Sequence, residues 1–258
     1  MKKPHVIIFS GYGLNTEDET KFIFEKVGAT AEIIHLNDII ARPSVLKKAE
    51  IIVFGGGFAY GDDTGAGKAY GNRVKAHLGK ELEEFLNRNT LMLGICNGFQ
   101  ILTSAGILPG ALIANDMPRY LCRWVDLEVQ NDSPWLRNIT RMSVPIAHGE
   151  GKYYASPEKL EELNQFGAVA LTYVGGETSQ HLGLSSNPNG SLGDIAGVTA
   201  YNGRVLGLMP HAERAVAFTQ LPHWTLLRES YIRAGMAIPE EGPGLQLFKN
   251  AVHYFHDK

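Results

Sequence analysis

The sequence predicts an α/β protein with an open, mostly parallel sheet flanked by helices and an additional antiparallel, strand-rich segment. Short apolar runs alternate with helix-length amphipathic segments in the first part of the chain, which is the order expected for parallel strands joined by right-handed crossovers. These runs lack polar alternation, as do strands buried on both faces. Within Leu121–Ala147, Val125, Leu127 and Val129 alternate with polar residues, which favours antiparallel pairing with one solvated face.

The elements of the first half follow from that alternation. Buried strands are predicted at His5–Phe9, Ala31–His35, Ile51–Phe54 and Leu91–Ile95. The first helix is expected to begin at the capping residues Asn15 and Thr16 and to end at Gly28. Two further helices are predicted, Arg73–Arg88 with its apolar side chains on one face and the shorter Gly98–Ala105.

The second half mixes strands with helices. The segment Leu121–Ala147 is predicted to be strand-rich, and Gly175–Asn189 is predicted to be a surface loop because glycine, proline and asparagine dominate it. Further strands are expected at Val169–Val174 and Val205–Met209, and further helices at Pro222–Ala234 and Gly244–His256. Without an internal repeat or linker, residues 1–258 are predicted to form a single domain with a helical extension at about 222–258.

Composition and charge exclude several function classes. The 258 residues include 24 Lys and Arg against 27 Asp and Glu, a net charge of −3. A nucleic-acid binder would need a basic face, so we expect no nucleic-acid partner. A hydrophobic content of 44% with 20% charged residues is typical of a globular protein. Two cysteines, Cys96 and Cys122, are too few for a disulfide framework, which favours a reducing, cytoplasmic location.

One uncharged stretch, Asn89–Asn115, is long enough to span a bilayer. Its internal polar residues and the pair Pro109–Gly110 instead predict a buried strand, a sharp turn and a buried helix. The apolar run after residues 1–4 is too short for a signal peptide. We therefore expect no membrane contact.

The strongest chemical signal is the pattern Gly-x-Cys-x-Gly around Cys96, where a predicted strand meets a predicted helix. This is the shape of a nucleophile elbow with cysteine in place of serine, and its glycines relieve crowding at the sharp turn. The helix N-terminus favours a thiolate by only about 0.3–1 kcal/mol. A nearby base is therefore required. Without such a base, Cys96 would be a small buried hydrophobic residue.

The predicted base is His211, which follows the strand Val205–Met209. Residues two apart in an extended segment point the same way, so Glu213 can lie beside His211, fix its tautomer and support its positive form. Alone, His-x-Glu is a weak signal and is usually a solvated strand end. Combined with the elbow, it predicts a Cys96–His211–Glu213 triad.

A third element is the glycine run Gly55–Gly57, directly after the strand Ile51–Phe54. A glycine turn at the C-terminal end of a parallel strand can aim backbone N–H groups at the elbow. The N–H groups of Gly57 and Asn97 are therefore predicted to form an oxyanion hole. A tight turn without function is the plain alternative.

A phosphate-binding loop is the rival interpretation of this region. A Walker loop needs the pattern Gly-x4-Gly-Lys-Ser/Thr. Counted from Gly67 and Lys68, Asp62 occupies the place of the first glycine and Ala69 the place of the hydroxyl residue. The rival interpretation is rejected.

These motifs together resemble the class I glutamine amidotransferases. The longer sequence segments around these motifs are similar to those of the glutaminase subunits of phosphoribosylformylglycinamidine synthase, which act in de novo purine biosynthesis. The segments that carry the resemblance are Gly56–Asp63, Gly94–Gln100, Ala147–Lys152, Asn187–Ser191, Asp194–Gly197 and Gly207–Arg214. The resemblance covers nearly the whole chain and implies a flavodoxin-like α/β fold.

The resemblance also implies a reaction. Cys96 attacks the side-chain amide of glutamine, His211 passes a proton to the leaving ammonia, and water releases glutamate from the thioester. Gln100 matches a family position that helps hold the substrate glutamine. The ammonia goes to a partner synthetase subunit, accompanied by a small bridging subunit, which uses ATP and magnesium to convert formylglycinamide ribonucleotide to its amidine. This chain is then expected to need no metal or other cofactor.

Other residues keep two interpretations. His148, in a family motif, either lines the site or contacts a partner, or else it is structural. Cys122 is expected to be a core thiol rather than a second nucleophile. His253 and His256 are expected on a solvated helix face rather than at a metal. The alternative functions are a glutaminase serving a different synthetase and a non-catalytic redox sensor that keeps Cys96 for oxidation.

Overall fold

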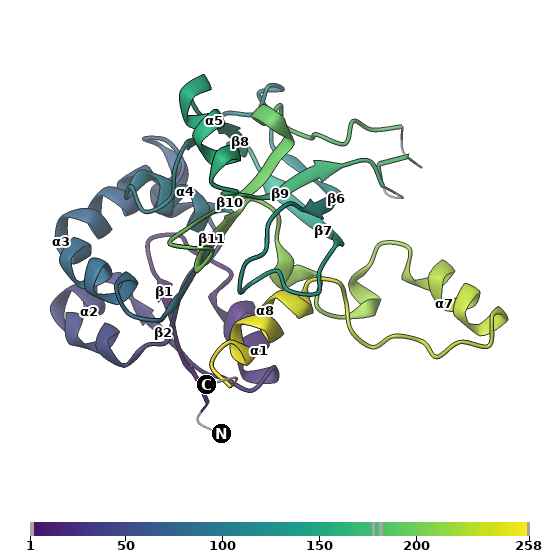
Figure 1. The fold of residues 1–258 in the computed structure, drawn as a ribbon, viewed down its shortest axis with the longest axis horizontal. Coiled ribbons are helices and arrows are strands. Elements are labelled where there is room, and N and C mark those ends of the chain that lie inside the picture. Colours follow the sequence, from purple (N-terminus) through teal and green to yellow (C-terminus); the bar gives the residue numbers. More distant parts are fainter. Residues whose placement is uncertain (1–2, 177–178, 181–182, 257–258) are drawn as a thin grey trace.

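The computed structural model describes residues 3–176, 179–180 and 183–256. Within these residues a nine-stranded mixed sheet has helices on both sides (Figure 1), so the predicted α/β class is confirmed. Its strands are β1 (His5–Ser10), β2 (Thr30–His35), β3 (Ile51–Phe54), β4 (Leu91–Ile95), β6 (Leu121–Val129), β7 (Arg141–His148), β9 (Val169–Val174), β10 (Ile195–Ala200) and β11 (Val205–Leu208).

The sheet has a parallel half and an antiparallel half. The strand order is β2-β1-β3-β4-β11-β10-β9-β6-β7. The first five strands in this order, from β2 through to β11, pair in parallel with their neighbours. The remaining pairs, from β11–β10 to β6–β7, are antiparallel. The predicted strand-rich segment therefore forms β6 and β7, which β9 and β10 join to the same sheet.

Helices cover the parallel half on both faces, which explains its apolar runs. Strands β3, β4 and β11 are buried along their whole lengths. The helix α1 (Glu17–Lys26) packs against β1, β2 and α8 (Leu245–His253), while α4 (Asn97–Ser104) packs against β3, β4, β11 and α3 (Lys68–Leu86). The strand β7 alternates instead, with Met142, Val144 and Ile146 turned inward.

The start of one helix and the cap of another differ from expectation. The helix α3 begins at Lys68 rather than Arg73, because its first turn packs closely on α4: a Cβ at Gly71 would lie 2.8 Å from the carbonyl oxygen of Ile101. Thr16 precedes α1 as predicted, but its side chain does not cap the helix. Its Oγ1 instead accepts a hydrogen bond of 2.8 Å from the backbone N–H of Gly56.

Several short elements were not predicted. These are α2 (Leu36–Ala41), α5 (Pro157–Gln165), the strand β10 and a two-stranded sheet of β5 (Ala111–Ile113) and β8 (Lys152–Tyr154). The helix α5 has a local signal, because the Ser156 side chain accepts a hydrogen bond from the N–H of Lys159. Residues 177–178 and 181–182 of the predicted loop Gly175–Asn189 lie outside the described residues.

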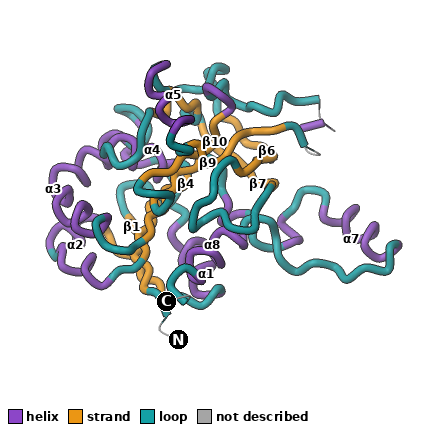
Figure 2. Tube along the Cα trace, in the orientation of Figure 1, coloured by secondary structure: helices purple, strands orange, loops and turns teal. Residues whose placement is uncertain are grey.

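Residues 222–258, predicted as a helical extension, contain two unlike helices. The helix α7 (Trp224–Arg233) has no buried residue and lies at the end of an arm that points away from the sheet (Figure 2). The helix α8 is part of the core, where Phe248 makes an edge-on ring contact with Phe24 of α1 at 5.3 Å between centroids. Among the described residues of this segment, α8 and the residues just after it contribute to the main core, whereas α7 does not.

Candidate active site

Cys96 occupies a strained turn between β4 and α4. Its φ of 51° and ψ of −108° lie outside the regions that non-glycine residues ordinarily adopt. The turn fits only because glycines flank it: a Cβ at Gly98 would overlap the backbone carbonyl of Phe54. The Cys96 N–H donates to the Leu208 carbonyl over 2.8 Å, which ties the elbow to the end of β11. These features confirm a strand–turn–helix elbow.

The Cys96 thiol is largely enclosed, with 4% of the residue exposed. Its Sγ lies 3.7 Å from the carbonyl oxygen of Ala147, to which the thiol donates a hydrogen bond. Ala147 belongs to β7, four strands away from β11 in the sheet order. The antiparallel half of the sheet therefore curves back toward the elbow, and β7 covers the sulfur.

His211 comes from the turn that follows β11, and β7 also holds this turn. Its backbone N–H donates to the Pro145 carbonyl over 2.8 Å. Its ring Nδ1 lies 2.5 Å from Oε1 of Glu213, and both residues are buried. Glu213 lies in a 3-10 turn, Ala212–Arg214, rather than in the extended segment expected from the sequence. The turn brings the two side chains together by a different backbone path.

Charges around His211 favour its protonated form. Burial alone lowers the pKa of His211, but the Glu213 carboxylate and the neighbouring Cys96 outweigh burial and raise this pKa to about 10. A side-chain hydrogen bond with Cys96 is among the causes of this rise, which places the thiol beside the imidazole ring. Because Nδ1 is held by Glu213, Nε2 is the nitrogen available to the cysteine and to a leaving group.

The two predicted oxyanion donors lie on adjoining turns. Gly57 has a φ of 150° and pairs with Leu14 in an isolated bridge, flanked by hydrogen bonds from Asn15 to Gly56 and from Phe58 to Gly13. Its own N–H has no acceptor among the described residues, nor does the N–H of Asn97 at the start of α4. Both N–H groups are therefore unoccupied in the described structure, and their binding of an oxyanion stays a prediction.

Gln100 lies one turn along α4 and is buried. Its Oε1 accepts a hydrogen bond of 2.7 Å from the Asn97 side chain, and its Nε2 donates to the Glu150 carbonyl over 2.6 Å. In this state both ends of the Gln100 amide contact protein groups. Its expected role in holding glutamine stays a prediction.

His148 ends β7 beside the site, with 2% of the residue exposed and neither ring nitrogen hydrogen-bonded among the described residues. Burial, followed by the charge of His211, lowers the pKa of His148 to about 4. The ring lies over Gly151, where a Cβ would overlap it. His148 is thus a neutral imidazole near His211, which fits the site-lining interpretation.

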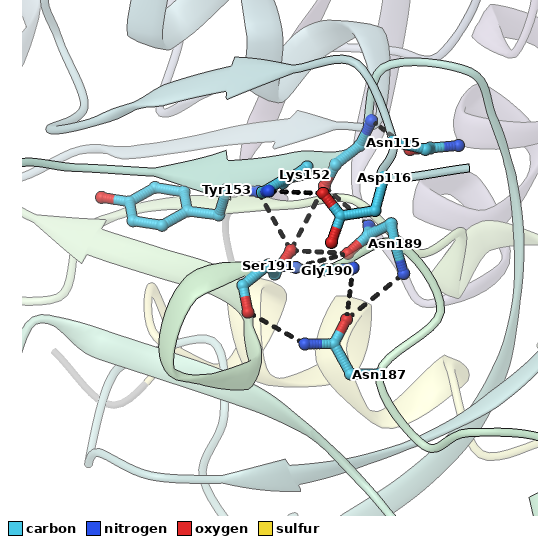
Figure 3. Close-up of polar contacts among 9 residues, drawn as sticks. Asn115, Asp116, Lys152, Tyr153, Asn187, Asn189, Gly190 and Ser191 are labelled. Atoms are coloured by element: carbon cyan, nitrogen blue, oxygen red, sulfur yellow. Dashed lines mark hydrogen bonds and ion pairs between the residues drawn. The ribbon is translucent and has the colours of Figure 1, made fainter. Parts of the chain in front are cut away.

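Buried asparagines hold the loop 148–151, and no local pattern in the sequence pointed to this contact. Figure 3 shows the neighbouring polar network that includes Asn115, Asn189 and Ser191. Asn115 donates from Nδ2 to the His148 carbonyl over 3.0 Å and accepts from the Gly151 N–H over 2.9 Å. Asn189, within the family motif Asn187–Ser191, donates to the Gly151 carbonyl over 2.8 Å. This part of the motif therefore has a structural role, because it fixes the loop that carries His148.

Two charged residues near the site also escaped sequence reasoning. Burial, together with the charge of Glu150, raises the pKa of Asp62 to about 6. Arg214 follows Glu213 and forms an ion pair with Glu19 of α1, with 3.1 Å between Nε and Oε1. The only sequence signal for either residue was its place inside a resembling motif.

Three further expectations concern residues around or outside the site. Cys122 is exposed, so the expectation of a core thiol is wrong: it lies on β6, directly opposite Ala147, on the solvated face of that strand. His253 and His256 lie near each other at the end of α8, and the described part of the chain holds no group of three metal-ligating side chains. No helix among the described residues is both long and apolar enough to cross a membrane.

The fold and this site define a class, the cysteine-dependent glutamine amidotransferases. Residues 3–255 match the family described as the CobB/CobQ-like glutamine amidotransferase domain. A Methanococcus maripaludis (strain C5) protein, phosphoribosylformylglycinamidine synthase subunit PurQ, is 44% identical over 98% of this chain and 99% of its own length. The PurQ protein of Dehalococcoides mccartyi is 38% identical over 98% of both chains.

Solved structures of glutamine amidotransferases share the fold of this chain. A chain described as the structure of PurLQS from Thermotoga maritima superimposes with a TM-score of 0.73 at 29% identity, covering 98% of this chain and 100% of that one. A second Thermotoga maritima glutamine amidotransferase, 17% identical with a TM-score of 0.55, covers 100% of this chain and 98% of its own and shares the fold. The chain belongs to the PurQ family of phosphoribosylformylglycinamidine synthase subunits.

Proposed function

We propose that this chain hydrolyses the side-chain amide of glutamine through a Cys96 thioester. The observation that carries the proposal is the enclosed arrangement of the elbow cysteine beside His211, whose Nδ1 is held 2.5 Å from Glu213. A sulfur at a helix N-terminus beside a protonated imidazole is an activated nucleophile. Membership of a glutamine amidotransferase family supplies the substrate class.

The residues divide the reaction between them. The Cys96 sulfur attacks the amide carbon, and the oxygen that becomes negative accepts hydrogen bonds from the N–H groups of Gly57 and Asn97. His211 gives a proton from Nε2 to the departing ammonia, which leaves a glutamyl thioester on Cys96. Water then attacks the thioester, His211 takes up the proton of that water, and glutamate leaves with the thiol restored. Glu213 keeps the His211 ring oriented throughout.

The released ammonia is the substrate of a partner subunit. The relatives carry the name of a synthase subunit, and the Thermotoga maritima neighbour is described as part of PurLQS. We infer that this chain binds the synthetase subunit and a small bridging subunit, and that the synthetase uses the ammonia, with ATP and magnesium, to convert formylglycinamide ribonucleotide to its amidine. The chain itself needs no cofactor for the steps above. Because Cys96 must stay a free thiol, we place the enzyme in the reducing cytoplasm.

Isotope transfer tests this function. The chain is co-purified with the synthetase and supplied with glutamine labelled with ¹⁵N in the side-chain amide, ATP, magnesium and formylglycinamide ribonucleotide. We expect ¹⁵N in the amidine product at the rate of glutamate release, even against a pool of unlabelled ammonia. Glutamate release without label in this product, or failure of the two chains to associate, would contradict the proposed partner.

A further inference from the structure

The side chain of Asn97 joins the two halves of the proposed oxyanion hole. Asn97 is fully buried, and its backbone N–H is one of the two proposed donors. Its Oδ1 accepts a hydrogen bond of 3.0 Å from the N–H of Ala59, two residues after the other donor, Gly57. The two turns come from different parts of the chain, and this bond connects them directly.

The orientation of the Asn97 carboxamide is itself fixed. Its Nδ2 donates to Oε1 of Gln100 over 2.7 Å and lies 3.4 Å from Oδ1 of Asp62. Because Gln100 and Asp62 offer only acceptors at these positions, Nδ2 must face them and Oδ1 must face Ala59. The carboxamide therefore cannot turn over without losing its bonds on both sides.

The loop that carries Gly57 needs such a restraint. Tyr60 and Asp62 both have positive φ values, 56° and 57°, which are unfavourable for residues with a side chain. Strained backbone persists only where neighbouring groups hold it. On one side, the N–H groups of Phe58 and Tyr60 donate to the carbonyls of Gly13 and Tyr12. On the other side, the hydrogen bond from Ala59 to Asn97 holds the loop.

We propose that the Asn97 side chain is a positioning residue that sets the spacing between the two oxyanion donors. The inference rests on the proposed thioester mechanism and adds a role that the backbone of Asn97 does not cover. An oxyanion hole works only when its donors are already placed where the charge develops. Loss of the carboxamide leaves both N–H groups present but frees the Gly57 turn to move relative to α4. The expected defect is therefore in the chemical step rather than in substrate binding.

The test uses Asn97→Leu, which keeps the branched shape and removes the hydrogen bonds, in the complex with the synthetase. A misplacement of about 1 Å in an active site can lower a rate by about 100-fold. We expect kcat for glutamate release to fall roughly 10- to 100-fold, with KM for glutamine changed less than about threefold. Alkylation of Cys96 by iodoacetamide builds no negative oxygen, so its rate should stay within about twofold of the unsubstituted enzyme.

The control is Asn250→Leu, which removes another buried asparagine that bridges backbone carbonyls, those of Trp135 and Arg137, outside the site. It should lower stability without changing kcat. Asn97→Ala repeats the test should the leucine variant not fold. An unchanged kcat in a folded Asn97 variant overturns the inference. A parallel loss of kcat and alkylation rate also overturns it, because the site would then be generally disordered. Full glutaminase activity of Cys96→Ser would instead overturn the proposed mechanism.

Discussion

The sulfur of Cys96 lies 3.7 Å from the carbonyl oxygen of Ala147, although the two residues belong to opposite halves of the sheet. The two residues come within hydrogen-bond distance because β7 returns to the elbow. The proposed role of this sulfur as the nucleophile leads to the first prediction.

Replacement of Cys96 by serine should abolish glutamine-dependent activity, by about 10⁴-fold or more, because the hydroxyl is a far weaker nucleophile beside this imidazole. Ammonia added to the complex should still drive the synthetase. The measurements are glutamate release and amidine formation with each nitrogen source. Cys122→Ser, which changes the exposed cysteine, is the matched control and should keep full activity. Retained glutamine use in Cys96→Ser would rule out the assignment.

Substitution of Glu213 by glutamine keeps the size of the side chain but removes its charge. The carboxylate helps to raise the pKa of His211, so we expect this pKa to fall and kcat to drop roughly 10²- to 10⁴-fold. Titration of the His211 ring protons by NMR follows the first effect, and glutamate release follows the second. Glu229→Gln, on the exposed helix α7, should change neither. A His211 that titrates as before would contradict the pairing.

Replacement of His148 by phenylalanine should change how stability depends on pH. The pKa of His148 is lowered to about 4 in the folded chain, so the unfolded chain takes up its proton first as the pH falls below about 6.5. His148 therefore contributes stability that is present above about pH 6.5 and is lost as the pH falls toward 4. By pH 5 this loss is about 2 kcal/mol.

Urea unfolding at pH 7 and pH 5 measures this loss. The drop in the free energy of unfolding between the two pH values should be smaller in His148→Phe than in the unsubstituted chain, by about the same 2 kcal/mol. Asp62, whose folded pKa is raised, contributes the opposite slope in both proteins and cancels in the comparison. Equal drops in the two proteins would mean that His148 is not held neutral.

Substitution of Gly98 by alanine should disrupt the elbow. The added Cβ would overlap the Phe54 carbonyl, and this neighbour is rigid backbone of β3. We expect the free energy of unfolding to fall by about 3 kcal/mol or more, at the upper end of overpacking effects. Gly79→Ala in α3 is the control, because nothing lies within 4 Å of its Cβ and alanine should stabilise that helix by about 0.5–1 kcal/mol. Thermal unfolding of both variants and of the unsubstituted chain measures these changes. A midpoint of Gly98→Ala equal to that of the unsubstituted chain would show that the elbow tolerates a side chain.

Local signals predicted the buried strands well. The predicted bounds of Ile51–Phe54, Leu91–Ile95 and Val169–Val174 match β3, β4 and β9, because each largely apolar run ends at a turn, which begins with glycine after Phe54 and Val174 and with Cys96 after Ile95. The strand β10 escaped because glycine and threonine interrupt its apolar residues. Strand β10 is held instead by pairing with β9 and β11, which the sequence does not display.

The site likewise has some features that local motifs indicate and others that only the folded structure reveals. Cys96, His211 and Glu213 lie in short motifs whose residue types and spacing already indicate the chemistry, so the sequence alone was enough to propose them. The hydrogen bonds from Ala59 to Asn97 and from Gln100 to Glu150 join residues 38 and 50 positions apart, so only the folded chain reveals them. Cys122 was misplaced because its exposure depends on which face of β6 meets the solvent.

The curvature that brings β7 to the elbow has a further consequence. An outermost strand normally offers unsatisfied carbonyl groups on which another molecule can add a strand. Here the carbonyls of Pro145 and Ala147 are occupied by the His211 N–H and the Cys96 thiol. The contacts that build the site therefore also occupy two carbonyl groups of this outermost strand, and loss of the turn at His211 would expose one of them to strand addition.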